Sequence, residues 1–556
     1  MRRFAPAFLA STLLVSALLA ALQPPQEVLA RESVDASAPT ALSVTVYRDP
    51  YADPENSMDL TWLEGFALVS ETRTVTLPAG EATVRFPGVV GGMVAVSAIV
   101  TGLPGGTIEK NRNAALLSPA SLVDGTLGNR VTVTRTNPAT GVKTVEDAIV
   151  RTRGDGGLVL QTKAGFEAVG CSGVPETLTF DKVPDGLLPV PVYTIDTVSR
   201  AGGTHTVRLT YLASGFDWRA HYVARVQPGS GPDRAIDLTA WLTIANENGE
   251  TLPDAQLLAV AGKLEVVEYP RDLSSAPVAE PLSLTCYPLA IANVPDPPEY
   301  IPLPPPPPAP MMMMSPDMEI IVTAQRRSES FADMPVAISA IAEEENLGDL
   351  KLYRIPGTAD VASKGMKQVA FLDRKGVRGR VIHKAPCNGD DAEWMDPDDE
   401  EELAETEFTP ASFLWRVKND KAHDLGLALP MGRVSVFEDA AGQAMLLGED
   451  DVRDYAANED FEVELGTSPG VALRCTWDGL NDQGSLADGK WHELRADLIN
   501  LNAGEAAVEL VLGSASDWQV RGVPGKVYFR DGRQTVDLKL KPGQRRMVKW
   551  KVRRPD

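Results

Sequence analysis

The sequence predicts a mainly β protein, built as multi-module antiparallel β-sandwiches with a proline-rich linker and little helix. Apolar and polar residues alternate in short runs rich in β-branched residues, the pattern of half-buried strands. Glycine (46) and proline (43) are frequent and separate these runs. Hydrophobic residues make up 44% of the chain, which is enough apolar material for real cores.

The first block of expected strands comprises SVTVYR (43–48), ALVSETRTVTL (67–77), ATVRFPGV (82–89) and VAVSAIVTG (94–102). We therefore expect an N-terminal β domain at 41–105, preceded by a short disordered leader at 31–40. The second block comprises RVTVTRT (130–136), AIVRTRG (148–154), GLVLQTK (157–163) and TLTFDKV (177–183). It predicts a small β barrel or sandwich module at 106–190.

The remaining chain, 191–556, is expected to be a C-terminal β-sandwich module. Its runs include HTVRLTYLASG (205–215), WRAHYVARV (218–226), DLTAWLTIANENGE (237–250), RVSVFED (433–439), FEVELG (461–466), AAVELVLG (506–513), TVDLKLK (535–541) and RMVKWKVRR (546–554). A short helix is expected at 336–346, and strands resume near 368–372.

Two stretches of unusual composition are expected to be inserts in that module. Residues 293–335 hold ten prolines between 295 and 310 and then four methionines, a composition typical of an extended polyproline II linker. Residues 388–408 form an acidic loop, with eleven acids between 390 and 407. This loop is either solvated or a calcium site, since carboxylates are the hard ligands that calcium prefers.

Residues 1–30 are expected to be a signal peptide. Met1-Arg2-Arg3 precedes an apolar run of export-signal length, and Ala30 is the expected cleavage site, with Ala21 as the alternative. An uncleaved anchor is the other interpretation. No later apolar run reaches the roughly 20 residues that a membrane span needs. The expected location is periplasmic or secreted, in a Gram-negative envelope.

The net charge of −23 argues against a nucleic-acid partner, because phosphate binding needs clustered Lys and Arg. It equally disfavours docking on an anionic membrane.

The four cysteines, Cys171, Cys286, Cys387 and Cys475, are widely spaced and contain no C-x-x-C motif. In an exported protein they could form two disulfides in three connectivities. We favour Cys387–Cys475, because both lie in the C-terminal half, while buried free thiols remain the alternative.

No catalytic motif stands in a supporting context, and we expect no cofactor, no metal ligands and no enzyme activity. The one G-x-S-x-G run, 466–470, is followed by a strand-like segment rather than the helix that a nucleophile elbow needs, so it predicts a hairpin turn. The abundant carboxylates leave a glycosidase pair open. Tryptophans could form a sugar platform or fill cores; they are Trp218, Trp241, Trp415, Trp477, Trp491 and Trp518.

Several segments between 193 and 556 resemble the domain of unknown function 4139. They are WRAHYVARV (218–226), WLTIANENGETLPDAQLLAVAGKL (241–264), LYRIPG (352–357), KQVAFLDRKGV (367–377) and VKNDKAHDLGLALPMGRVSVFEDAAGQAMLLGEDDV (417–452). The N-terminal runs VTVYRD (44–49) and LPAGEATVRFPGV (77–89) resemble mucoidy-inhibitor-like proteins more weakly. Those proteins often place a long helical segment where 106–185 is β-rich here. The resemblance implies an exported β-sandwich protein without established catalytic residues.

The segment MEIIVTAQRRSESFADMPVAISAI (318–341) resembles the start of mature TonB-dependent outer-membrane receptors. Its β-prone residues beside a flexible tether suit strand addition to a partner's sheet edge. The candidate partner-binding residues are Glu319, Ile320, Ile321, Val322 and Thr323. Docking on the chain's own sandwich is the alternative.

Together these observations predict an exported, non-enzymatic envelope interaction or scaffold protein, with a periplasmic or envelope protein as partner. The alternative is a carbohydrate-binding or weakly glycan-hydrolysing protein.

Overall fold

The computed structural model describes most of the chain from residue 31 onward. The described residues are 31–113, 116–152, 158–169, 176–184, 187–229, 231–266, 268, 270–274, 282, 341–388, 408–440, 442–477 and 489–555. They form four sheets of mainly antiparallel strands, one α-helix, α2 (Pro119–Gly125), and two short 3-10 helices, η2 (Ala95–Ser97) and η5 (Lys421–His423). The predicted fold class, mainly β with little helix, is confirmed.

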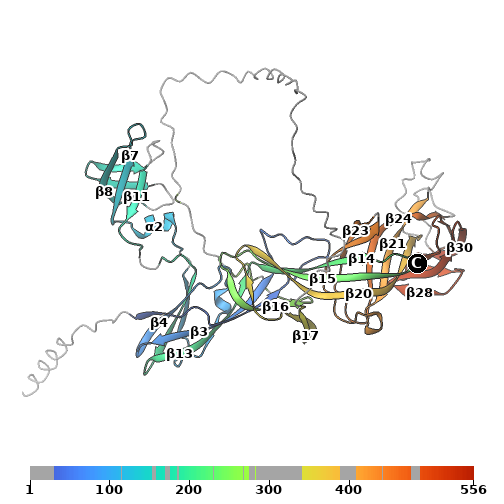
Figure 1. The fold of residues 1–556 in the computed structure, drawn as a ribbon, viewed down its shortest axis with the longest axis horizontal. Coiled ribbons are helices and arrows are strands. Elements are labelled where there is room, and N and C mark those ends of the chain that lie inside the picture. The colour runs from blue at the N-terminus through green and yellow to red at the C-terminus, as the bar shows by residue number, and fades with distance from the viewer. Residues whose placement is uncertain are drawn as a thin grey trace, which may run out of the picture.

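The first two sheets share one hydrophobic core; in Figure 1 their strands β3, β4 and β13 lie at one end of the elongated molecule, and β16 and β17 lie near its middle. The four-stranded sheet has the order β1-β4-β12-β6, and the eight-stranded sheet has the order β17-β18-β16-β2-β3-β13-β5, with β19 paired to β16. The bounds are β1 (Glu32–Asp35), β2 (Ala41–Tyr47), β3 (Phe66–Leu77), β4 (Gly80–Pro87), β5 (Ile99–Thr101), β6 (Glu109–Asn113), β12 (Val192–Ser199), β13 (Gly203–Ser214), β16 (Leu252–Ala261), β17 (Glu343–Leu347), β18 (Leu350–Arg354) and β19 (Ala359–Val361). Alternate residues such as Val44, Val69, Val84 and Leu209 are fully buried in this core.

The third sheet is a five-stranded body with its own small core. Its order is β10-β9-β8-β7-β11, with β7 (Arg130–Thr136), β8 (Lys143–Val150), β9 (Leu158–Thr162), β10 (Gly165–Val169) and β11 (Glu176–Phe180). Helix α2 begins after Ser118, whose hydroxyl accepts from the Ser121 N–H while the Ser121 hydroxyl accepts from the Ser118 N–H. This capping box satisfies two backbone donors and holds Val123 of the helix over Val131 and Val133 of the sheet.

The fourth sheet contains thirteen strands. Its main order is β23-β22-β14-β15-β20-β21-β24-β25-β30-β27, while β26 pairs with β20 and β29, and β28 pairs with β29. The bounds are β14 (Phe216–Val226), β15 (Asp233–Asn246), β20 (Gly365–Pro386), β21 (Thr409–Lys418), β22 (Gly432–Ala440), β23 (Gln443–Val452), β24 (Asp460–Trp477), β25 (His492–Asn500), β26 (Ala506–Ser514), β27 (Gln519–Arg521), β28 (Val527–Arg530), β29 (Arg533–Leu540) and β30 (Arg545–Arg553).

Three of these strands line two different cores. Phe371 of β20, Trp415 of β21 and Phe461 of β24 belong to the large shared core. Further along the same strands, Ala411 and Leu473 belong to a second core, which β25, β26, β29 and β30 complete as a C-terminal sandwich. Register shifts in the β15–β20 and β21–β24 pairings let the long strands bend between the two cores.

The stretch before the first expected strand contains β1, so the expected disordered leader at 31–40 is wrong. β1 pairs in parallel with β4, and Ala36 is buried in the shared core. Arg31 forms ion pairs with Glu81 and Asp196, which lie on other strands. Because these partners are distant in sequence, the local composition does not reveal the strand.

Three local expectations also differ from the structure. The segment 466–470 is not a hairpin turn but a bend inside β24, where Gly466 has a φ of 102°, a conformation that favours glycine. The described part of the expected helix at 336–346 contains β17, because pairing with β18 overrides the helix preference of its glutamates. The expected strand at 94–102 is η2 followed by β5.

Strands from different expected modules pair with one another, so the sheets cross the expected module boundaries at residues 105 and 190. β12 lies between β4 and β6, and β13 pairs with β3 along its whole length. The expected signal peptide at 1–30, the linker at 293–335 and residues 389–407 of the acidic loop lie outside the described residues. Within the described residues, no helix combines the length and the apolar character that crossing a membrane would require.

A disulfide joins Cys387, directly after β20, to Cys475 in β24, with Cα atoms 5.5 Å apart. Cys387 is fully buried in the second core. The two residues are 88 positions apart in the chain, so the bond closes a long loop. Cys171 and Cys286 lie outside the described residues.

Replacing both cysteines by alanine in a Cys387→Ala/Cys475→Ala variant should destabilise the C-terminal sandwich by about 2–5 kcal/mol, because the unfolded loop gains conformational freedom. Urea unfolding followed by tryptophan fluorescence measures it, since Trp518 and Trp550 are buried in that core. An unchanged unfolding midpoint would contradict a stabilising role for the bond.

Candidate functional site

The described residues offer no obvious metal or nucleophile chemistry. No group of three or more His, Cys, Asp or Glu side chains among them is placed to hold a metal ion. The Ser468 hydroxyl is buried in β24 and accepts from the Val471 N–H at 3.2 Å, so it does not face a substrate. The calcium hypothesis for the acidic loop falls on residues outside the described part of the chain.

Three of the candidate tryptophans are too deeply buried to form a sugar-binding platform. Trp218 and Trp415 lie in the large core, and Trp518 lies in the second core. Trp218 donates from its indole to the carbonyl of Val260 at 3.1 Å. These three side chains therefore stabilise the fold and are not available to stack on a sugar.

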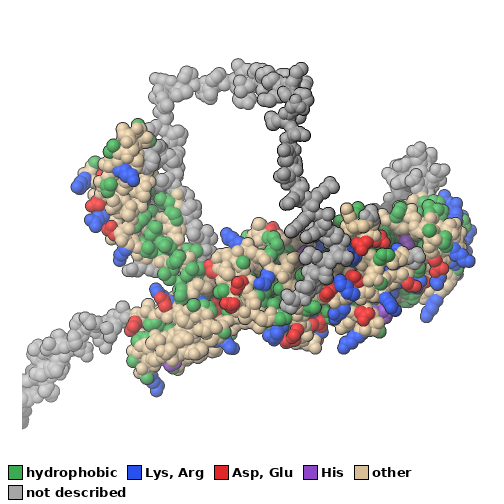
Figure 2. Space-filling model, in the orientation of Figure 1, with side chains coloured by type: hydrophobic (Ala, Val, Ile, Leu, Met, Phe, Trp, Pro, Cys, Tyr) green, Lys and Arg blue, Asp and Glu red, His purple; other side chains and the backbone are tan. Residues whose placement is uncertain are grey.

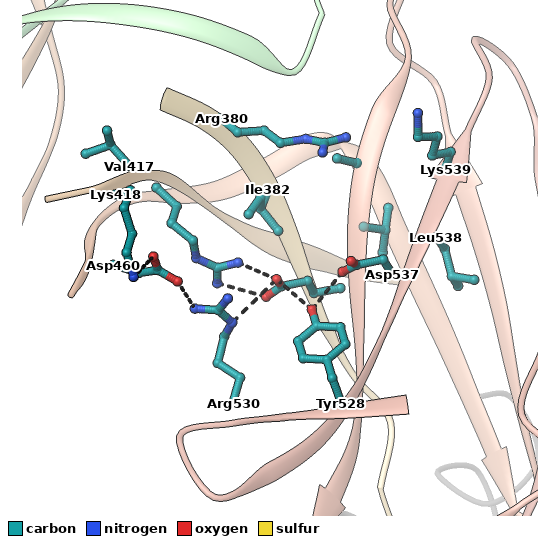
Figure 3. A pocket seen from close by; sticks show the side chains of 14 residues that line it. Arg380, Ile382, Val417, Lys418, Asp460, Tyr528, Arg530, Asp537, Leu538 and Lys539 are labelled. Atoms are coloured by element: carbon teal, nitrogen blue, oxygen red, sulfur yellow. Dashed lines mark hydrogen bonds and ion pairs between the residues drawn. The ribbon is translucent and has the colours of Figure 1, made fainter. Parts of the chain in front are cut away.

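A polar groove opens on the outer face of the C-terminal sandwich, with a volume of about 490 Å³ (Figure 3). Six strands contribute to it: β20, β21, β24, β26, β28 and β29. In β26, Val508 and Leu510 point into the core, so the intervening Glu509 points outward into the groove. Strand alternation thus places the charged side chains on one surface.

Arg416 and Glu509 form the centre of the groove. Two guanidinium nitrogens of Arg416 donate to the two carboxylate oxygens of Glu509, one of them at 2.9 Å, while Arg416 Nε donates to Glu462. The Glu509 side chain is only 4% exposed. Burial alone would raise the pKa of Glu509, but hydrogen bonds and charge from Arg416, with help from Tyr528, outweigh burial and lower it.

Arg530 extends the pair into a network. Its Nη1 donates to Asp460 at 3.1 Å and to Glu462 at 3.2 Å, and its Nε lies 3.8 Å from Glu509. Lys384 Nζ donates to Glu462 at 3.2 Å. Since these residues come from five strands, the network ties β20, β21, β24, β26 and β28 together.

The Tyr528 hydroxyl lies between two carboxylates, 2.9 Å from Glu509 and 2.7 Å from Asp537. Its single proton can serve only one of them at a time. Burial and the two neighbouring carboxylates raise the pKa of Tyr528, so the phenol stays a neutral donor. Asp537 is exposed and is the acid of this pair that a ligand can reach.

A second hollow, of about 750 Å³, continues the groove along β20 and β21. Its wall carries the exposed cations Lys375, Arg378, Arg380 and Lys418, against the acids Asp233 and Asp424. Arg378 and Arg380 form no ion pair within the described part of the chain. This end of the groove is therefore open to an anionic group.

The groove satisfies part of what glycan hydrolysis needs. Glu509 and Asp537 both contact the Tyr528 hydroxyl, so they lie close together, as the carboxylates of retaining enzymes do. However, Glu509 is buried, its two oxygens both accept hydrogen bonds from Arg416, and its pKa is lowered, so it is poorly placed to donate a proton to a substrate. The arrangement supports recognition better than proton transfer.

Sequence reasoning did not find this site. Arg416 lies 93 residues before Glu509, and Tyr528 and Arg530 come from a third strand, so only strand pairing brings the four side chains together. One signal was present: Glu509 interrupts the apolar run AAVELVLG, at 506–513, where a lone carboxylate needs a partner. The candidate partner-binding residues at 319–323 lie outside the described residues, so strand addition stays a prediction.

Comparisons with known proteins do not assign this chain to a family. No protein-family model matches the chain, and no curated protein matches it. Among solved structures, Escherichia coli alpha-2-macroglobulin activated by porcine elastase aligns at 9% sequence identity with a TM-score of 0.10, over 94% of this chain and 47% of that one. The chain thus spans about half of that protein, and the likeness is too low to carry an argument. The resemblance to the domain of unknown function 4139 stays a prediction.

Outside the groove, Asp217 is a buried acid that holds the segment after β2. Its Oδ1 accepts from the backbone N–H groups of Trp218 at 2.8 Å and Asp49 at 3.1 Å. Burial raises the pKa of Asp217 to about 7, although these hydrogen bonds oppose the shift. At 4% exposure Asp217 cannot reach a ligand, so its titration acts on stability.

Replacing Glu509 by glutamine should destabilise the protein by about 3 kcal/mol, because it leaves the buried Arg416 charge with a single carboxylate partner. Urea unfolding measures this. Glu505→Gln is the matched control, because Glu505 is exposed and its ion pair with Lys539 spans 3.7 Å, so about 0.5 kcal/mol or less is expected. Equal losses in both variants would show that the network contributes little.

The pH dependence of stability should change in Asp217→Asn. Because the folded pKa is raised, the wild type loses stability as pH rises from about 4 to 7, by at most about 1.4 kcal/mol per pH unit. The variant lacks this loss, so its stability relative to wild type should increase between pH 5 and pH 8 in urea unfolding. Asp517→Asn, the same substitution at an exposed position, is the matched control. A parallel pH profile for Asp217→Asn and wild type would exclude the proposed titration.

Proposed function

We propose that this chain is an exported, non-enzymatic β-sandwich protein that acts as an interaction or scaffold protein of the cell envelope. The observation that carries the proposal is the polar groove of the C-terminal sandwich. Its central acids are already paired with arginines, while its rim presents Arg378 and Arg380 without ion-pair partners among the described residues. Such a surface offers fixed charges for binding a charged partner.

Two further observations support export. The disulfide between Cys387 and Cys475 is typical of proteins in an oxidising compartment. The first 30 residues have the pattern of a signal peptide, with Arg2 and Arg3 ahead of an apolar run. The resemblance of 193–556 to an exported family of undefined role points in the same direction.

The alternative is a carbohydrate-binding or weakly glycan-hydrolysing protein. The closeness of Glu509 and Asp537 at the Tyr528 hydroxyl favours it. An enzyme of this kind would need one of the two acids protonated near neutral pH. The lowered pKa of Glu509, produced by Arg416 against the effect of burial, opposes that role for Glu509.

Photo-crosslinking in intact cells tests the proposal. A photoreactive amino acid at Arg380 or Lys418, both exposed at the groove, should give a discrete adduct with an envelope component. The same group at Lys143, exposed on the five-stranded sheet, is the control and should give none.

Two outcomes would overturn the proposal. The first is identical adducts from groove and control positions. The second is hydrolysis of a glycan by the purified protein that Asp537→Asn abolishes while the fold is retained, since this would establish the enzymatic alternative.

A further inference from the structure

The C-terminal sandwich has a second outer surface, on the other side of the core from the groove. The strands β24, β25, β30 and β27 are neighbours in this order. Their inward residues, such as Leu494, Val548 and Trp550, fill the second core. The alternate residues point outward, so the character of the outer face is set by every second position.

That outward face is strongly basic. By register it carries seven cations, Arg474, Arg495, Arg521, Arg545, Lys549, Lys551 and Arg553, against two acids, Glu493 and Asp497. In a chain with a net charge of −23, this concentration of positive charge is local. Figure 2 shows Lys and Arg side chains along the C-terminal end of the molecule. We call these seven residues the basic face.

Internal contacts satisfy the two acids and leave cations over. Asp497 is buried and accepts from Arg545 at 2.9 Å and from Arg474 at 3.2 Å. Glu493 accepts from Arg495 at 2.9 Å and from Lys549 at 3.2 Å. The acids thus position their neighbours, and among the described residues the face keeps an excess of positive charge.

Aromatic rings hold several guanidinium groups in place. The Trp491 ring lies 3.8 Å from the guanidinium carbon of Arg521 and 5.1 Å from that of Arg553. Phe408 contacts Arg474 and Arg545 in the same way, at 5.1 and 5.3 Å. Cation–π contacts restrict these long side chains, so less entropy is lost when they bind an anion.

We propose that the basic face binds a linear polysaccharide that carries a carboxylate on its repeating unit. Adjacent strands lie about 4.8 Å apart, and outward residues repeat about every 7 Å along each strand, so the cations form a regular array roughly 14 Å wide. A linear polymer with one anion per sugar also presents its charges at regular intervals along a narrow chain. Arginines suit its carboxylates because their planar forks bind them bidentately.

Other anionic partners fit the surface less well. A bilayer or a duplex is a broad charged surface, so it would also approach the acidic remainder of the chain and be repelled. The outward positions of β30 include one exposed apolar side chain, Met547, which gives little area for insertion into lipid. A narrow polymer can cross the four strands without leaving the basic face. This proposal concerns a surface separate from the groove and does not rest on the function proposed for it.

The test uses purified protein and oligomers of polygalacturonate as the probe, with binding followed by calorimetry. We expect binding that weakens as NaCl rises, because salt screens exposed charges. The charge-reversal variant Lys549→Glu/Lys551→Glu should lower the affinity about tenfold or more. Lys143→Glu/Lys163→Glu changes the net charge equally and should leave the affinity unchanged, because Lys143 is exposed on β8 and Lys163 is exposed in the turn between β9 and β10.

Circular dichroism checks that both charge-reversal variants are folded. Lys551→Gln is a milder variant of the basic face, since Lys551 is exposed and makes no ion pair among the described residues. The proposal is overturned by no binding, by equal losses in the two charge-reversal variants, or by tighter binding to polyglutamate or to phosphatidylglycerol vesicles. The photo-crosslink from position 380 should be unchanged in the Lys549→Glu/Lys551→Glu variant. Loss of polysaccharide binding with an unchanged crosslink therefore distinguishes the basic face from the groove.

Discussion

Three long strands, β20, β21 and β24, determine how the rest of this protein is arranged, because each of them lines two hydrophobic cores. A strand that contributes side chains to two cores must bend where it passes from one core to the other. The register shifts opposite Gly466 and along β15 provide that bend. The two cores therefore belong to one continuous sheet, and the disulfide at Cys387 and Cys475 links the far ends of two of these strands.

The same strands explain where the charged residues go. Where β21 and β24 leave the large core, their outward positions carry Arg416 and Glu462, which meet Glu509 and Arg530 from the C-terminal strands. A buried ion network of this kind is costly unless every member has a partner. On the other side of the core, the outward positions carry seven cations against two acids, so the sandwich presents a groove with a central ion network on one face and a basic surface on the other.

Much of the fold could be predicted because strand formation leaves a local mark. The alternation in ALVSETRTVTL and in TVDLKLK corresponds to β3 and β29, and the 44% hydrophobic content supplies their cores. Prediction failed where distant pairing decides the structure. β1 has few apolar residues and is held by partners near Glu81, and β17 is rich in glutamate but pairs with β18. The sequence around Gly466 predicts a hairpin turn instead of a bend inside a strand, because β-bulges and hairpin turns both favour glycine.

The sequence by itself determined the class of fold, the position of the unusual proline and acidic segments, and the features that point to export. These follow from composition and short-range periodicity, which do not depend on what a residue meets in space. Only the tertiary structure decided the site. The contacts Arg416–Glu462, Arg530–Glu462 and Arg416–Glu509 join residues that are 46, 68 and 93 positions apart, and no local pattern states which charges will meet. Sheet register makes that choice, because it aligns outward positions of strands that are distant in the chain.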